Sequence, residues 1–272
     1  MKTTLNIHPN KARPWIIAHR GACREAPENT RSAFDRALSY NIDGLELDIQ
    51  MTRDGRPVLF HDRTLFKING RRKQIRDYTY EQLRDFDWGA WYASAYTGEP
   101  LLTLEETLRS YSRRTRLLIE IKSRKPEKTS GRSLELTDKV LKEISLRVPP
   151  EYINRIFILS FDRDVLEFAF QKTPGLNYVL NLSASTYGPA SPSGVISQPP
   201  AENDFLHAFC VKEKFLSREL VAFAHKRKKR VMTYACNILR QANHALSLNV
   251  DAIMTDKSDW LTRVFQVNSN SP

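Results

Sequence analysis

Strand and helix patterns alternate along this 272-residue chain, and that alternation limits the fold more than any other feature of the sequence. Parallel strands joined by helices close into a barrel when there are eight of them. We therefore predict one α/β domain, residues 1–272, folded as a (β/α)8 TIM-type barrel. The predicted barrel strands lie at residues 15–18, 45–49, 117–122, 155–160, 176–182, 205–211, 230–236 and 251–255. The first predicted helix begins after residues 27–30, and the others cover residues 103–111, 133–147, 163–172, 217–226, 237–248 and 258–266.

The second strand belongs to the stretch Gly44 to Asp62, GLELDIQMTRDGRPVLFHD. Its residues alternate, so Glu46 and Asp48 leave the strand on one face, about 6 to 7 Å apart. Asp54-Gly55 favours a two-residue hairpin turn, and residues 58–60 would form the returning strand. That pairing places His61 opposite Asp48. The spacing suits a hard divalent cation, but two acids on a half-exposed strand face would give the same pattern.

Residues 63–100 interrupt the alternation. Aromatic residues are concentrated there among glycines and charged residues, without a clear period. We predict an insertion after the second strand that forms a lid over a ligand pocket. A small separate hydrophobic core under a long loop is the alternative.

Polar residues stand at the ends of several other predicted strands. His19 and Arg20 follow the first strand, and Glu120 and Lys122 share one face of the third. In this architecture the chemistry lies at the carboxyl ends of the strands, so these residues are expected to meet in one polar site. For Glu120 and Lys122, an internal salt bridge explains the pattern equally well.

Composition and charge restrict the partners. The chain has no apolar run of about 18 residues and no secretory leader pattern, so we expect a cytoplasmic protein. Its three cysteines form neither a disulfide framework nor a zinc pattern. The net charge is +11, with the densest run at Lys226–Arg230, which we interpret as a solvated helix end. Aromatic residues do not alternate with these cations, so no nucleic-acid partner is expected, whereas contact with an anionic membrane surface remains open.

Four motifs together resemble the glycerophosphodiester phosphodiesterase family. They are HRGACREAPENT at 19–30, GLELDIQMTRDG at 44–55, VLFHD at 58–62 and IEIK at 119–122. LSFD at 159–162 and MTD at 254–256 are similar to weaker motifs of the same family. The resemblance covers about residues 15 to 260.

The resemblance implies an activity and roles for individual residues. It implies a phosphoric diester hydrolase that converts a glycerophosphodiester into sn-glycerol 3-phosphate and an alcohol, with one divalent ion, Ca²⁺ or Mg²⁺. By motif position, the metal ligands would be Glu46, Asp48 and Glu120, the acid/base pair His19 and His61, and the substrate- or phosphate-binding residues Arg20, Lys122, Asn29 and Tyr234. Tyr234 stands where the family commonly has tryptophan.

Two other functions stay open at this point. A related phosphodiesterase of the lysophospholipase D or sphingomyelinase D type would use the same histidines and acids on lipid substrates. A barrel that binds phosphate or lipid without catalysis would also carry these charged residues. The presence of every motif nevertheless argues for an enzyme.

Overall fold

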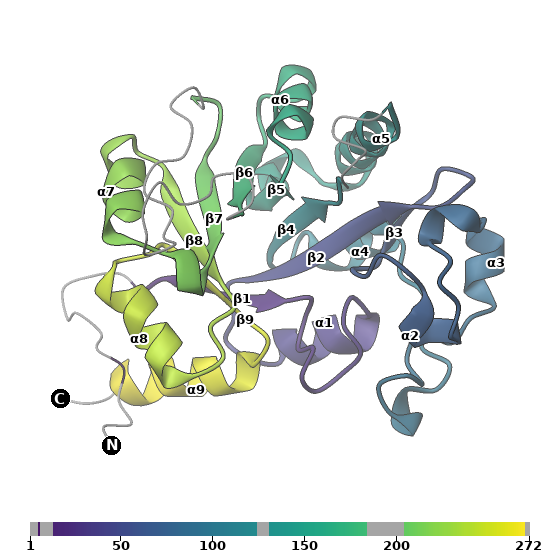
Figure 1. Cartoon of the computed structure of the whole chain (residues 1–272), viewed down its shortest axis with the longest axis horizontal. Coiled ribbons are helices and arrows are strands. Elements are labelled where there is room, and N and C mark those ends of the chain that lie inside the picture. The colour runs from purple at the N-terminus through teal and green to yellow at the C-terminus, as the bar shows by residue number, and fades with distance from the viewer. Residues whose placement is uncertain (1–4, 6–12, 124–130, 184–203, 270–272) are drawn as a thin grey trace.

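The computed structural model describes residues 5, 13–123, 131–183 and 204–269. Eight parallel strands form the barrel, and β1 pairs with both β2 and β9, which closes it (Figure 1). The predicted TIM-type fold is therefore confirmed. The strands are β1 (Trp15–His19), β2 (Gly44–Met51), β3 (Pro57–Leu59), β4 (Arg116–Ile121), β5 (Ile156–Ser160), β6 (Asn177–Leu182), β7 (Ala208–Lys212), β8 (Arg230–Tyr234) and β9 (Ala252–Thr255).

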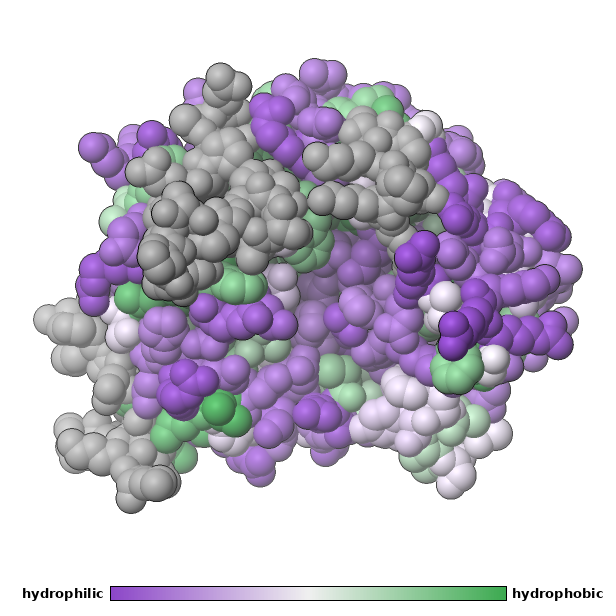
Figure 2. Space-filling model, viewed as in Figure 1, coloured by the Kyte–Doolittle hydropathy of each residue, from purple (hydrophilic) through white to green (hydrophobic). Residues whose placement is uncertain are grey.

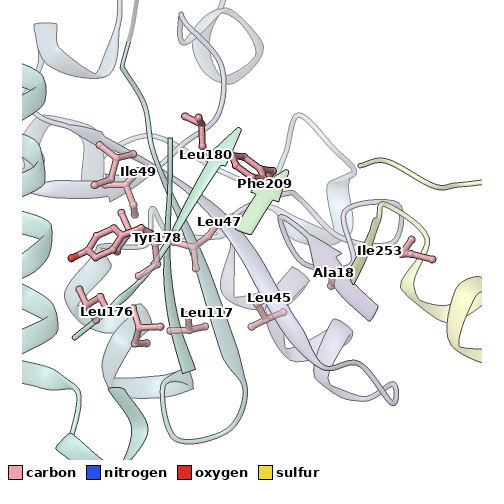
Figure 3. Close-up of a cluster of buried hydrophobic side chains, with 14 of the residues drawn as sticks. Ala18, Leu45, Leu47, Ile49, Leu117, Leu176, Tyr178, Leu180, Phe209 and Ile253 are labelled. Atoms are coloured by element: carbon pink, nitrogen blue, oxygen red, sulfur yellow. The ribbon is translucent and has the colours of Figure 1, made fainter. Parts of the chain in front are cut away.

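Helices surround the strands (Figure 1). Side chains on the outer faces of the strands, among them Leu45, Leu47 and Tyr178, are buried beneath these helices (Figure 3). Alternate residues point inward, and Ile17, Leu118 and Val179 fill the barrel itself. The helices are α1 (Arg31–Leu38), α2 (Phe66–Asn69), α3 (Tyr80–Arg84), α4 (Leu104–Tyr111), α5 (Gly131–Arg147), α6 (Arg163–Lys172), α7 (Arg218–Lys226), α8 (Leu239–Ser247) and α9 (Ser258–Ser269).

The loop between β1 and α1 has a constrained backbone. Arg20 and Asn29 adopt left-handed φ angles of 58° and 59°, and Gly21 has a φ of 81°. A Cβ on Gly21 would lie 2.7 Å from the carbonyl carbon of Ala33, so only glycine fits this close approach. Thr30 then caps α1, because its hydroxyl oxygen accepts a hydrogen bond from the Ala33 amide. This loop carries Arg20 and Asn29 to the mouth of the barrel.

The hairpin register differs from the prediction by one residue. Ile49 pairs with Leu59 and Met51 with Pro57, so Asp48 faces Phe60 rather than His61. The amide of Phe60 donates to the Asp48 carbonyl at 3.0 Å. The reason is a wider turn: the amide of Thr52 donates to the carbonyl of Arg56, which leaves three residues in the loop, with Gly55 at a φ of 82°.

The insertion after β3 has a hydrophobic cluster of its own. Leu65, Ile75, Leu83 and Trp88 are buried there together with Val58, Phe60, Tyr78 and Leu101. Its short helices α2 and α3 lie to one side of the barrel (Figure 1). The alternative of a separate small core is thus what the packing shows, and a lid function for residues 63–100 stays a prediction. The sequence also predicts an irregular segment at residues 183–203, which are rich in serine, proline and glycine; all but the first of these residues lie outside the described part of the chain.

Candidate active site

A polar pocket opens at the carboxyl ends of the barrel strands. It encloses about 210 Å³, and Figure 2 shows a hollow near the middle of the viewed face, bordered by hydrophilic residues. Seven of the nine residues predicted from the motifs line it, and the other two, Asp48 and Asn29, do not. The lining residues are His19, Arg20, Glu46, His61, Glu120, Lys122, Leu159, Phe161, Asn181, Cys210, Tyr234 and Met254.

Three carboxylates meet at the base of this site. Glu46 and Asp48 lie on β2, and Glu120 is the partner of Asp48 on the neighbouring strand β4. One oxygen from each lies within 4.8 Å of the others. Glu46 and Asp48 are buried, at 2 % and 0 % exposed, so the half-exposed strand face considered from the sequence is ruled out. Oxygen ligands of this kind are those that Ca²⁺ and Mg²⁺ prefer.

Two cations balance part of this negative charge. Lys122 Nζ lies 2.7 Å from Asp48 Oδ1 and 2.5 Å from Glu120 Oε1, and Arg20 Nε lies 3.2 Å from Asp48 Oδ2. The salt bridge considered for Glu120 and Lys122 is therefore present, as one part of a larger cluster. Three acids against two cations leave one excess negative charge. A divalent ion would reverse that charge, and a phosphodiester monoanion would then make the site neutral.

The pKa values reflect this crowding. Burial, and then the neighbouring carboxylates Asp48 and Glu120, raise the pKa of Glu46 well above its usual range. Burial acts the same way on Asp48, but Lys122 and Arg20 outweigh it and hold the pKa of Asp48 well below its usual range. Glu46 is consequently the acid that most needs a further positive charge in order to be ionised.

His19 is held by the carboxylate of Asp256, the residue directly after the last barrel strand. Its Nδ1 lies 2.7 Å from Asp256 Oδ1, and its Nε2 faces Glu46 Oε2 at 3.8 Å. Asn237 donates to Asp256 Oδ2 at 2.6 Å and accepts from the Asp256 amide at 2.9 Å. Burial opposes ionisation of Asp256, but the hydrogen bond and charge of His19 outweigh it and lower the pKa to about 2. The acid therefore stays charged and directs the other imidazole nitrogen toward the pocket.

His61 has an equivalent partner in the next residue. Its Nδ1 lies 2.9 Å from Asp62 Oδ1, and Lys67 Nζ of α2 lies 3.0 Å from the other oxygen of Asp62. Lys67 also contacts Glu28 at 2.5 Å, and Glu28 accepts from Arg20 at 3.1 Å. The hydrogen bond of His61, helped by Lys67, lowers the pKa of Asp62 below its usual range. Lys67 of the insertion thus contacts the carboxylate partners of two pocket residues, His61 and Arg20.

Asn29 and Tyr234 take different positions. Asn29 Nδ2 donates to Asp48 Oδ2 at 2.9 Å, and Asn29 Oδ1 accepts from the Asp48 amide at 3.2 Å. Asn29 is buried, at 3 % exposed, and it orients a carboxylate of the acidic cluster. Tyr234 lines the pocket beside His19, with ring centroids 6.4 Å apart. A direct contact of either residue with substrate stays a prediction.

The motifs had not assigned a role to Asp256, Asp62, Glu28 or Asn181. Asp62 and Asp256 stand in the quoted motifs VLFHD and MTD, so their presence was visible although their partners were not. Asn181 donates to Glu120 Oε2 at 3.1 Å from β6. Its position, two residues after the inward-facing Val179, was the available signal, because inward residues repeat every second position.

Comparison with known proteins agrees with the sequence motifs. The model of the glycerophosphoryl diester phosphodiesterase family matches residues 19–260. The chain is 29 % identical over 253 residues to the glycerophosphodiester phosphodiesterase of Caldanaerobacter subterraneus subsp. tengcongensis, covering 90 % of this chain and 95 % of the relative. It is 26 % identical over 249 residues to the glycerophosphodiester phosphodiesterase of Bacillus altitudinis, covering 92 % and 97 %.

A solved structure shows the same fold. It is that of an Oleispira antarctica phosphodiesterase in complex with the product sn-glycerol-3-phosphate, with a TM-score of 0.80 and 22 % sequence identity. The superposition covers 93 % of this chain and 97 % of that one.

Proposed function

The chain belongs to the glycerophosphoryl diester phosphodiesterase family, and from that premise we propose that it hydrolyses glycerophosphodiesters to sn-glycerol 3-phosphate and an alcohol. The observation that carries the proposal is that His19 and His61 line one pocket with Arg20, Lys122 and two acids of the cluster, Glu46 and Glu120. The Oleispira antarctica phosphodiesterase of the same fold was solved with that product, which supports this choice of substrate.

The acidic cluster of Glu46, Asp48 and Glu120 fits one divalent ion, Ca²⁺ or Mg²⁺. Its donors are all carboxylate oxygens, and it carries more negative charge than Arg20 and Lys122 balance. When bound, the ion would supply positive charge next to the phosphate oxygens. Arg20 and Lys122 would add donors to the same oxygens, because a phosphodiester accumulates negative charge in its transition state.

The two histidines would move the protons. One imidazole takes a proton from the attacking hydroxyl, and the other gives one to the oxygen of the leaving alcohol. Asp256 and Asp62 each hold the Nδ1 atom of their histidine, so both Nε2 atoms are available to the substrate. We favour attack by the substrate's own glycerol 2-hydroxyl, which would give a cyclic phosphate before water opens it.

The test is release of glycerol 3-phosphate from glycerophosphocholine and glycerophosphoethanolamine, with and without a chelator. We expect turnover that the chelator abolishes and Ca²⁺ or Mg²⁺ restores. His19→Ala and His61→Ala should each lose activity by about 10²-fold or more, the usual contribution of a positioned acid or base. His225→Gln is the matched control, because His225 pairs with Asp251 away from the pocket.

Three results would contradict parts of the proposal. Binding of glycerol 3-phosphate without turnover of any diester would make the barrel a binding module. Release of choline from lysophosphatidylcholine, with no reaction on deacylated diesters, would place it among the lipid phosphodiesterases. Absence of any cyclic product in a rapidly quenched turnover would refute attack by the 2-hydroxyl.

A further inference from the structure

The first part of the insertion, residues 63–76, forms a basic segment next to the active site. It contains Arg63, Lys67, Arg71, Arg72, Lys73 and Arg76 and no aspartate or glutamate. Arg71, Arg72 and Lys73 are consecutive and exposed. In the described part of the chain, neither Arg71 nor Arg72 takes part in an ion pair, so their charges face the solvent. Such a local excess of positive charge attracts an anionic surface.

An aromatic side chain protrudes from the same segment. Phe66, the first residue of α2, is 61 % exposed, the largest exposure of any large aromatic side chain in the described residues. Its neighbour Leu65 is completely buried, and Ile68 packs against the same small core. The inner face of α2 therefore anchors the helix, while Phe66 points away from it.

The backbone holds Phe66 and the arginines together. Gly70 ends α2 with a φ of 70° and reverses the chain, and the amide of Leu65 donates to the carbonyl of Lys73 at 2.8 Å. This bond closes a compact loop from Leu65 to Lys73, which contains both Phe66 and the two arginines. An exposed aromatic ring beside several cations is the pattern of a segment that lies in the interface of an anionic bilayer.

The segment is also connected to the pocket. Lys67 of α2 contacts Asp62, the partner of His61, and Glu28, the partner of Arg20. A bilayer bound through Phe66 would consequently lie beside the opening through which the substrate enters the pocket. We propose that residues 63–76 dock the protein onto an anionic lipid bilayer. The benefit of that docking rests on the proposed function, since diesters derived from phospholipids arise at such surfaces.

A second basic cluster provides an internal control. Lys226–Arg230 joins the end of α7 to the start of β8, at the opposite end of the barrel from the pocket. Three of its five cations are already engaged: Arg227 lies over the Phe223 ring at 3.8 Å, Arg230 lies over the Trp15 ring at 4.5 Å, and Lys229 donates to the Asp204 carbonyl. None of the exposed large apolar side chains of the described residues belongs to this cluster. If charge alone were sufficient, both clusters would bind equally.

The experiment is co-sedimentation of the full chain with vesicles of phosphatidylcholine, with and without phosphatidylserine, at low and high salt. We expect binding only to the vesicles that contain phosphatidylserine, weakening as salt rises. Arg71→Glu with Arg72→Glu should weaken it by about 100-fold or more, since each lost cation near an anionic surface contributes about fivefold and each introduced glutamate adds repulsion of similar size. Phe66→Ser should weaken it by about tenfold, and Arg227→Glu with Lys228→Glu should change it less than about twofold.

Activity on soluble glycerophosphocholine separates this proposal from the proposed function. The Phe66 and Arg71/Arg72 variants should keep the wild-type rate and thermal midpoint, because these side chains are exposed. A wild-type protein that turns over diesters but does not bind phosphatidylserine vesicles refutes the docking alone. One that binds the vesicles through residues 63–76 but cleaves no diester refutes the proposed function alone. Equal losses from the Arg227/Lys228 control, or binding to a single-stranded RNA but not to the vesicles, would overturn the docking.

Discussion

Asp256→Asn is the substitution that best tests how the site is assembled. Asp256 lies at the end of β9, 2.7 Å from His19 Nδ1, and Asn237 holds its second oxygen at 2.6 Å. Asparagine has nearly the same shape, so the fold should persist. What changes is the charge, and with it the preference of His19 for the tautomer that carries its proton on Nδ1.

The magnitude follows from the pKa. A pKa of about 2, against an ordinary value of 3.8, corresponds to about 2.4 kcal/mol at 1.36 kcal/mol per unit. The side chain is 24 % exposed, so solvent screens part of this and we expect a loss of about 1–2 kcal/mol in the free energy of unfolding at pH 7. Because the folded-state pKa is lowered, the stabilisation is complete above pH 3.8 and is lost as the pH falls toward 2, with roughly half gone by pH 3.

Two assays measure these effects. Urea unfolding of both proteins at pH 7 and pH 3 should show a difference that shrinks at the lower pH. The kcat of the variant should fall by about 10- to 100-fold while KM stays nearly constant, because the carboxylate orients His19 without touching substrate. Asp259→Asn is the control, since the Asp259 carboxylate pairs with Arg263 on the surface of α9 and does not line the pocket. Equal kcat values for the wild type and Asp256→Asn, or a stability difference that grows at pH 3, would refute the reasoning.

Three further substitutions test other parts of the structure. Gly21→Ala should destabilise the protein by about 2–4 kcal/mol in urea unfolding, because its Cβ would meet the Ala33 backbone, whereas Gly131→Ala, with nothing within 4 Å, should be neutral or stabilising. Glu46→Gln should remove most of the rise in thermal midpoint that Ca²⁺ or Mg²⁺ produces in the wild type; an unchanged rise would show that the ion binds elsewhere. Lys67→Met should lower kcat by about tenfold and Lys67→Arg should restore most of it, because the partly buried carboxylates of Glu28 and Asp62 share that cation. Equal losses in both variants would contradict a role for the charge.

The register predicted for the β2–β3 hairpin was wrong by one residue. Asp54-Gly55 favours a two-residue turn, but a three-residue loop with Gly55 in the left-handed conformation suits the same dipeptide. Side chains on a strand alternate, so this single step moves His61 away from the position opposite Asp48. His61 still reaches the pocket, because β3 ends at Leu59 and the chain leaves the strand before His61.

The partners of the histidines could not be predicted for a different reason. Asp256 is separated from His19 by almost the whole chain, and closure of the barrel brings β9 next to β1. No periodicity or local spacing encodes that pairing. Lys67 is similar, since its contacts with Asp62 and Glu28 depend on how the small core of the insertion places α2.

The sequence alone was sufficient to predict the barrel and the side chains at its mouth. Both predictions rest on local properties, namely the order of strands and helices and the residue types at the strand ends. Hydrophobic periodicity determines which face of each element is buried, and parallel connections leave few ways to arrange eight such units. The tertiary structure alone decided which charges pair. Ion pairs such as His19 with Asp256 and Lys122 with Asp48 depend on distances of a few ångströms between residues from different strands, and those distances exist only after the barrel has closed.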